Sequence, residues 1–333
     1  AGVLLLSEDL VSGERGTLGQ IEARTCAVRA LAEQWFGVLV RSPLAEERWL
    51  ASGLAGSLAG KVVAKHFGEN EGAYQWSRKL DLVVAEQDDA SPSIAHTGQA
   101  GFGLAQELQR YTSSHVLRHK ADLLVWMVEN RTGAEPFQKV VKAIVQGALK
   151  ETSGTVGCRL TCEDFFDRAA KVFDSGVDKN WLQSFNERWI VGRGCPHVVV
   201  AFCFNRKQHA ISVALKQSGL KSANVSGTAA VKCCGKESSG LGMITLVTGE
   251  TDGVHRNKVF LGDQSLVLEE IKCHGKLAAK KRKRKDDKEE TPDEKEPCGP
   301  VKWLDVHHNF EWFASFEVSQ PEKMWINHLE SSR

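Results

Sequence analysis

The spacing of apolar residues changes near Trp189, and this change constrains the fold more than any other feature of the chain. From residue 21 to residue 182 apolar side chains recur every three or four positions, a pattern typical of helices that bury one face. After Trp189 they occur in short runs rich in β-branched and aromatic residues, separated by Gly, Asn and Asp. The sequence therefore predicts an α+β multidomain protein, with a mostly helical part followed by a β-rich part.

The helical part is interrupted by Gly, Pro and Ser clusters that divide it into separate helices. We expect helices at residues 27–40, 48–67, 70–86, 104–130, 137–150 and 161–173. The first is nearly apolar throughout and is expected to be buried. Asn70 is a candidate cap for the third helix, and Thr161 with Asp164 forms a capping signal for the last. Residues 88–103 contain few large apolar groups and are predicted to be a surface loop.

The β-rich part has the strand lengths and turn signals of an antiparallel β-sandwich. The predicted strands lie at residues 197–204, 209–215, 241–248, 258–261, 265–271 and 301–306, and a helix is expected to begin at Gln320. Residues 2–6 are also strand-like. Because no initiator Met precedes Ala1, we expect the chain to be the middle part of a longer protein.

Composition excludes several classes of protein. The 333 residues are 42% hydrophobic, too many for an intrinsically disordered chain, and no apolar run approaches the roughly 18–20 residues of a membrane-spanning helix. The nine cysteines are odd in number and include no C-x-x-C pair. This pattern disfavours a disulfide framework or a zinc ribbon, and it favours a reducing compartment.

The net charge of +1 conceals one strongly polar segment. Residues 276–285 carry seven basic and no acidic side chains, and residues 286–296 carry seven acids against two lysines. Since this segment has almost nothing to bury, residues 275–298 are predicted to form a disordered loop. The basic run itself comprises Lys280, Lys281, Arg282, Lys283, Arg284 and Lys285. It could serve as a nuclear-import signal, contact DNA phosphates or simply keep the loop soluble; the absence of interleaved aromatic residues favours import over DNA contact.

One pattern in the helical part is more specific than the rest. Residues 29–37 read RALAEQWFG, residues 48–55 read RWLASGLA, and residues 67–71 read FGENE. This pattern resembles the aminopeptidase N family of zinc metallopeptidases, whose metal helix reads H-E-x-x-H-x-W-F-G and is followed by W-L-N-E-G-F-A. In that family two His and a later Glu bind zinc, and the Glu between the His residues is the general base.

The resemblance implies that the chemistry of the family has been lost. The two His positions fall on Arg29 and Glu33, the base falls on Ala30, and the third ligand falls on Ser52. The Tyr that stabilises the oxyanion in the family is replaced by Arg118. Because a guanidinium offers no lone pair to a metal, we expect the protein to bind no zinc and no other cofactor and to have no peptidase activity. Instead we expect an i,i+4 ion pair between Arg29 and Glu33.

Further matches extend along the chain, among them AFCFNRK at residues 201–207 and QPEKMWINHLE at residues 320–330. With these, the chain resembles an inactive branch of the family, the TBP-associated factors of the general transcription factor TFIID. The resemblance implies a degenerate thermolysin-like domain at residues 1–184, a β-sandwich at 185–314 and the start of a helical-repeat domain at 315–333. It also implies a nuclear, non-catalytic scaffold for core-promoter recognition and preinitiation-complex assembly for RNA polymerase II. Other TFIID subunits would be its partners, with core-promoter DNA as a further one, and neither a membrane nor a small-molecule substrate is expected.

Two alternatives remain open at this point. One is a zinc aminopeptidase whose metal has moved to ligands drawn from His66, His96, His115 and His119; His115 and His119 have the i,i+4 spacing of a ligand pair. The other is an inactive relative outside the nucleus that acts as a peptide-binding module.

Overall fold

The computed structural model describes Leu6, Glu8 and residues 16–86, 93–95, 115–151, 158–172, 185–192, 194–218, 241–262, 266–275, 300–306 and 309–331. The chain forms two compact units. The first, here called the helical unit, contains Ala1–Cys195, Lys221–Cys233 and Phe310–Phe313. The second, the β unit, contains Pro196–Leu220, Cys234–Asn309 and Ala314–Arg333.

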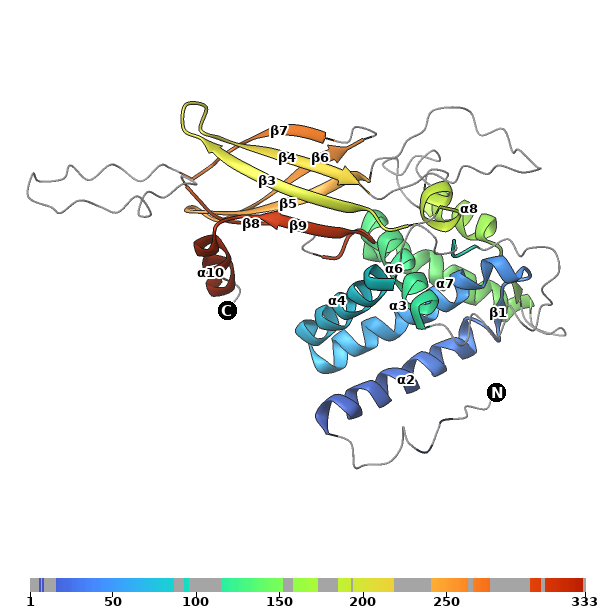
Figure 1. Cartoon of the computed structure of the whole chain (residues 1–333). Coiled ribbons are helices and arrows are strands. Elements are labelled where there is room, and N and C mark those ends of the chain that lie inside the picture. Colours follow the sequence, from blue (N-terminus) through green and yellow to red (C-terminus); the bar gives the residue numbers. More distant parts are fainter. Residues whose placement is uncertain are drawn as a thin grey trace, which may run out of the picture. The chain divides into compact units, whose positions relative to one another are not determined.

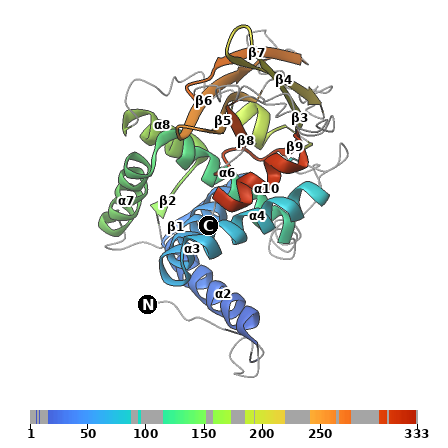
Figure 2. The same ribbon diagram turned by 90° about the vertical axis from the view of Figure 1, so that its left-hand side faces the viewer.

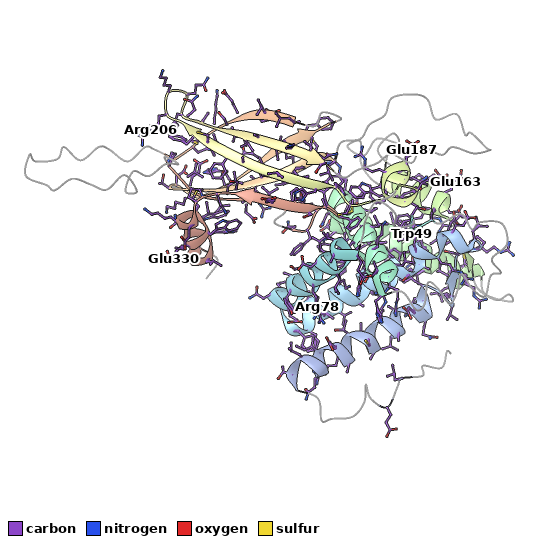
Figure 3. All side chains as sticks on the ribbon, in the orientation of Figure 1. Trp49, Arg78, Glu163, Glu187, Arg206 and Glu330 are labelled. Atoms are coloured by element: carbon purple, nitrogen blue, oxygen red, sulfur yellow. The ribbon has the colours of Figure 1, made fainter. Side chains whose placement is uncertain are left out.

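The helical unit is built around helix α3 (Arg48–Phe67), which packs against three neighbours. These are α2 (Thr17–Trp35), α4 (Glu69–Glu86) and α6 (His115–Thr132), and they lie side by side in Figures 1 and 2. Helices α7 (Ala134–Glu151) and α8 (Cys162–Val172) complete the unit. Trp49, Leu54 and Leu124 are almost fully buried in its core, and Figure 3 marks the position of Trp49.

Short elements join these helices. A 3-10 turn η1 (Ala45–Glu47) leads into α3, strands β1 (Val40–Arg41) and β2 (Cys158–Arg159) form a parallel pair, and η2 (Asn186–Ile190) is a single π-helical turn. The capping signal before α8 is confirmed. The Thr161 hydroxyl accepts from the Asp164 backbone N–H at 3.0 Å, and the Asp164 carboxylate accepts from the Thr161 N–H at 3.2 Å.

The predicted bounds hold best for α3, which spans 48–67 in both cases. The prediction for the first helix was wrong: α2 begins at Thr17 and ends at Trp35, and among its side chains only Ala32 is buried. The chain leaves the helix there because Gly37 has φ of 141° and Val40 enters β1. The predicted Asn70 cap was also wrong, since α4 begins at Glu69 and Asn70 lies inside it.

The β unit contains a four-stranded and a three-stranded sheet. The first has the order β7-β4-β3-β9, with β7 (Leu266–Lys272), β4 (Ala210–Ser218), β3 (His197–Asn205) and β9 (Ser315–Ser319). The second has the order β6-β5-β8, with β6 (Val254–Leu261), β5 (Gly242–Glu250) and β8 (Val301–Val306). Helix α10 (Glu322–Ser331) packs against β8, as Figure 2 shows.

Alternate residues of the strands form the core of the β unit. Val198 and Val200 of β3, Val213 of β4 and Leu246 of β5 are almost fully buried. All six predicted strands are present and pair with one another in antiparallel fashion, but one further strand departs from the expected antiparallel sandwich. Strand β9, which was not predicted, pairs in parallel with β3. The turn from β3 to β4 carries Arg206, labelled in Figure 3.

Several predicted segments lie outside the described residues. These are residues 2–5 of the strand at 2–6, most of the loop at 88–103, the start of the helix at 104–130, and residues 276–298 of the charged loop, including Lys280–Lys285. The cysteines within the described part of the chain form no disulfide bonds. None of the helices described there is long and apolar enough to cross a membrane.

Candidate functional site: a buried ion-pair cluster

Arg29 of α2 makes four polar contacts within the helical unit. Its Nη1 lies 2.6 Å from Asp122 Oδ2, and its Nη2 donates to the hydroxyl of Ser52 at 3.0 Å and to the Ser52 carbonyl at 3.2 Å. Its Nε donates to Glu33 Oε1 at 3.3 Å, so the predicted i,i+4 ion pair is present. The Arg29 side chain is only 11% exposed, and its donors face these oxygens rather than water.

Arg118 of α6 joins the same group. Its Nη2 lies 3.1 Å from Glu33 Oε1, the carboxylate oxygen that also accepts from Arg29. Four positions singled out from the sequence motif, Arg29, Glu33, Ser52 and Arg118, are thus brought together by α2, α3 and α6. Ala30, the fifth, lies next to Arg29 on α2 and contributes no polar side chain.

Two members of the cluster were missed by the sequence analysis. Asp122 of α6 is fully buried, and Lys79 of α4 places its Nζ 2.9 Å from Asp122 Oδ2. The available signal was indirect. A Cβ at Gly56 of α3 would collide with the Asp122 carboxylate. A glycine on the face of α3 that packs against α6 was thus the available sign of where the two helices approach each other. We call Arg29, Glu33, Ser52, Lys79, Arg118 and Asp122 the ion-pair cluster.

The charges of the cluster control each other's protonation. Burial alone would raise the pKa of Asp122, but the neighbouring Lys79 and Arg29 hold it below its ordinary value. Burial alone would lower the pKa of Arg29, but the attraction of Asp122 and Glu33 keeps that pKa above its ordinary value. Asp122 and Arg29 are therefore both charged at neutral pH.

The donor set of this cluster does not fit zinc. Zinc needs three or four lone pairs from imidazole, thiolate or carboxylate that converge on one point. Here the carboxylates of Glu33 and Asp122 are directed at guanidinium and ammonium groups, and a cation placed among them would face Arg29, Lys79 and Arg118. The arrangement has the chemistry of a structural salt-bridge network.

The histidines considered for a relocated metal do not form a three-ligand group in the described part of the chain. The rings of His115 and His119 are 6.4 Å apart, and burial lowers the pKa of His119 to about 4. His66 lies at the end of α3 with its ring edge-on to Phe67, and His96 lies outside the described residues. Among the described residues, the group of three side chains close enough to hold a metal is Glu250, His255 and His274 in the β unit.

Comparison with known proteins gives consistent matches along the chain. Residues 193–321 match the family model of the TAF2 Ig-like domain. The chain is 24% identical to transcription initiation factor TFIID subunit 2 of Drosophila melanogaster over 344 residues, which cover 93% of this chain and 27% of the relative. The subunit 2 of Schizosaccharomyces pombe is 23% identical over 387 residues, covering 99% of this chain and 32% of the relative. The chain thus spans about a third or less of the length of these relatives.

The fold has a counterpart among solved structures. Aminopeptidase A of Legionella pneumophila, solved in complex with aspartic acid, aligns with a TM-score of 0.58 over 94% of this chain and 29% of that chain, at 14% identity. At this identity the likeness concerns the fold. The chain is therefore a homologue of TFIID subunit 2, with a TAF2 Ig-like domain in its β-rich part and an aminopeptidase-like fold.

Proposed function

We propose that this chain is part of a non-catalytic scaffold subunit of TFIID, which supports core-promoter recognition and preinitiation-complex assembly. The observation that carries the proposal is the side chain of Arg29. It occupies the place of a metal-binding His in the aminopeptidase motif and donates hydrogen bonds to Asp122, Ser52 and Glu33. Such a network offers neither the ligand set of a catalytic zinc nor, with Ala30 at the position of the base, a group that could activate water.

The proposal includes the domain assignment. Residues 1–184 would be the latter part of a thermolysin-like domain and residues 185–314 a β-sandwich. The expected start of a helical-repeat domain at residues 315–333 is corrected, because β9 (Ser315–Ser319) belongs to the sheet of the β unit. Only α10 (Glu322–Ser331) remains as the proposed entry to such a domain. The helical unit gives way to the β unit between Cys195 and Pro196, and the matched Ig-like domain begins at residue 193. Both observations support a domain boundary in this region.

The partners would be other TFIID subunits, in the nucleus, with core-promoter DNA as a further one. Cross-linking of the intact protein in nuclear extract, followed by mass spectrometry, tests this assignment. We expect cross-links from both units to TFIID subunits. A tagged protein that stays outside nuclei, or that cross-links only to proteins unrelated to transcription, would contradict the proposal.

Direct DNA contact by the basic run needs a separate test. Replacing Lys280–Lys285 with Ala in the intact protein should weaken promoter binding and flatten its salt dependence, because fewer counterions are released. A matched variant with the acidic residues of 286–296 replaced by Ser controls for the general effect of altering this loop. Unchanged binding after the Lys280–Lys285 replacement would exclude this run as a DNA contact.

A further inference from the structure

A second cluster of ionisable side chains lies in the β unit, where β5 ends. Glu250 is the last residue of β5, His255 is the second residue of β6, and His274 follows β7 by two positions. One possible ligand atom of each side chain lies within 4.8 Å of those of the other two. Neither the sequence motif nor the proposed scaffold function accounts for this cluster.

The backbone holds the three residues in place. Residues 251–253 turn β5 into β6, and the Glu250 N–H donates to the Gly253 carbonyl at 2.7 Å. The segment after β7 is held by His209: the Cys273 N–H donates to the His209 carbonyl at 3.0 Å, and His209 Nε2 lies 2.8 Å from the Gly275 carbonyl oxygen. The cluster therefore rests on two anchored segments.

Glu250 is oriented like a metal ligand. Its Oε2 accepts two backbone N–H groups, from His274 and Gly275, each at 2.7 Å. Its Oε1 accepts a long hydrogen bond of 3.4 Å from the Thr248 hydroxyl and lies 3.9 Å from His274 Nδ1. The side chain is fully buried, and a buried carboxylate is costly unless a cation or strong donors compensate its charge. One oxygen is thus fixed by the backbone while the other is directed toward the histidines.

The two imidazoles lie against each other. The rings of His255 and His274 stack with centroids 4.2 Å apart and an interplanar angle of 15°. Asp252 Oδ1 lies 3.2 Å from His255 Nε2, so a second carboxylate orients this ring. The side chain of His274 is 54% exposed and that of His255 is 26% exposed, which leaves solvent access to the cluster.

We propose that Glu250, His255 and His274 bind a divalent transition-metal ion, with Zn²⁺ the ion that fits best. Two imidazole nitrogens and one carboxylate oxygen are a ligand set that zinc prefers, whereas Ca²⁺ and Mg²⁺ prefer oxygen ligands alone. Zinc bonds of about 2.0–2.2 Å require ligand atoms closer together than 4.8 Å. A bound ion would draw the two imidazoles toward Oε1 of Glu250, the oxygen that the backbone N–H groups do not hold, and so close this gap. The fourth position is open to water.

The bound ion would link the β5–β6 hairpin to the end of β7. Since Zn²⁺ would bind the folded unit and not the separated ligands of the unfolded chain, it should raise the melting temperature. The site lies in the β unit and involves no member of the ion-pair cluster, so it does not depend on the proposed scaffold function.

Zinc titration of the whole chain against a chromophoric chelator tests the site, after metal has been removed by dialysis. We expect one equivalent of Zn²⁺ to bind, no competition from Mg²⁺, and a rise in melting temperature on adding zinc. The variant His255→Ala/His274→Ala should lose the equivalent, and Glu250→Gln should weaken binding by more than about tenfold. Co²⁺ in place of zinc should give the absorption of a four-coordinate N/O site in the parent chain alone.

The matched control is His115→Ala, which removes one ring of the other close His pair and should leave zinc binding unchanged. Circular dichroism and thermal unfolding without metal identify any variant that fails to fold, and the conservative His274→Gln replaces it in that event. The proposal is overturned if the parent chain binds no zinc. It is equally overturned if the folded double variant binds zinc as the parent does, or if His115→Ala abolishes binding.

Discussion

Asp122 shares one carboxylate oxygen between Arg29 and Lys79 at a position with no solvent access. Asp122→Asn keeps the size of the side chain but removes the charge that both cations face. We expect the free energy of unfolding to fall by about 3–5 kcal/mol, because two largely buried cations lose their counter-charge. Urea denaturation at neutral pH measures the change.

The matched control for this variant is Glu22→Gln. Glu22 pairs with Arg78 at 2.9 Å, but both side chains are about half exposed, at 48% and 49%. Removing the Glu22 charge should cost no more than about 1 kcal/mol. Equal effects of the two variants would mean that the buried cluster contributes nothing particular to stability.

His119 makes the stability of the helical unit depend on pH. Burial lowers its pKa to about 4; Asp122 opposes this shift to a smaller extent, and Lys79, Arg29 and His115 add to it. Below its ordinary pKa of about 6.5 the unfolded chain takes up a proton that folded His119 does not. Stability should therefore be lost as the pH falls from about 6.5 toward 4.

The His119→Gln variant should lose less stability than the parent chain over this range, as measured by urea denaturation at several pH values. Carboxylates titrate in both proteins and cancel in the difference. An identical pH dependence would show that His119 is protonated as readily in the folded chain as in the unfolded one.

At the scale of single residues, the motif on α2 and its continuation along α3 identified most of the ion-pair cluster. Arg29, Glu33 and Ser52 follow from fixed spacings along α2 and α3, and Arg118 follows from its place before Lys120 and Ala121. Asp122 and Lys79 could not be predicted in the same way. Their contact joins α4 to α6 across 43 residues, and such a contact depends on how the helices pack rather than on local spacing.

Helices α3 and α6 approach each other closely because α3 presents glycines at the contact. A Cβ at Gly53 would lie 2.5 Å from the Ala121 carbonyl oxygen, and a Cβ at Gly56 would collide with the Asp122 carboxylate. One turn further along, Lys61 pairs with the buried Glu129 at 2.6 Å, and Ser57 donates to Glu129 at 3.3 Å. Polar groups thus line an interface that is otherwise apolar.

Gly56→Ala should therefore destabilise the helical unit even though Ala is the better helix former. We expect a loss of about 1–3 kcal/mol from overpacking, measured by thermal or urea unfolding. Gly147→Ala on α7 is the matched control, because its Cβ would have only an ordinary contact at 3.8 Å with Arg168. That control should be neutral or stabilising by up to about 1 kcal/mol. A stabilising Gly56→Ala would contradict the close approach of α3 and α6.

Elements with clear boundary signals were predicted best. Helix α3 begins and ends where predicted, because the helix-breaking residues Pro43 and Gly68 lie on either side of it. Helix α2 was misplaced because its apolar residues continue past Trp35 into β1, and periodicity alone does not mark that end. Strand β9 is short and half polar, so pairing with β3 rather than its own sequence makes it a strand.

At the scale of the whole molecule, the two units carry different kinds of polar site. The helical unit has an ion-pair cluster in which charged side chains of opposite sign face one another, and the β unit has a carboxylate and two histidines with ligand atoms near one another. The difference is compatible with the proposed non-catalytic role of the helical unit. It also means that zinc bound to the chain cannot be assigned to the ion-pair cluster until the site at His255 and His274 has been removed by mutation.

Zinc content of the His255→Ala/His274→Ala variant is the most direct test of the claim that the cluster around Arg29 replaces a catalytic metal centre. The intact protein carrying these substitutions is dialysed against zinc without chelator, then against buffer, and analysed for metal. Our account predicts no stoichiometric zinc and no chelator-sensitive cleavage of aminoacyl reporters. One equivalent of retained zinc that Arg29→Ala or Glu33→Ala alters, accompanied by such cleavage, would contradict it.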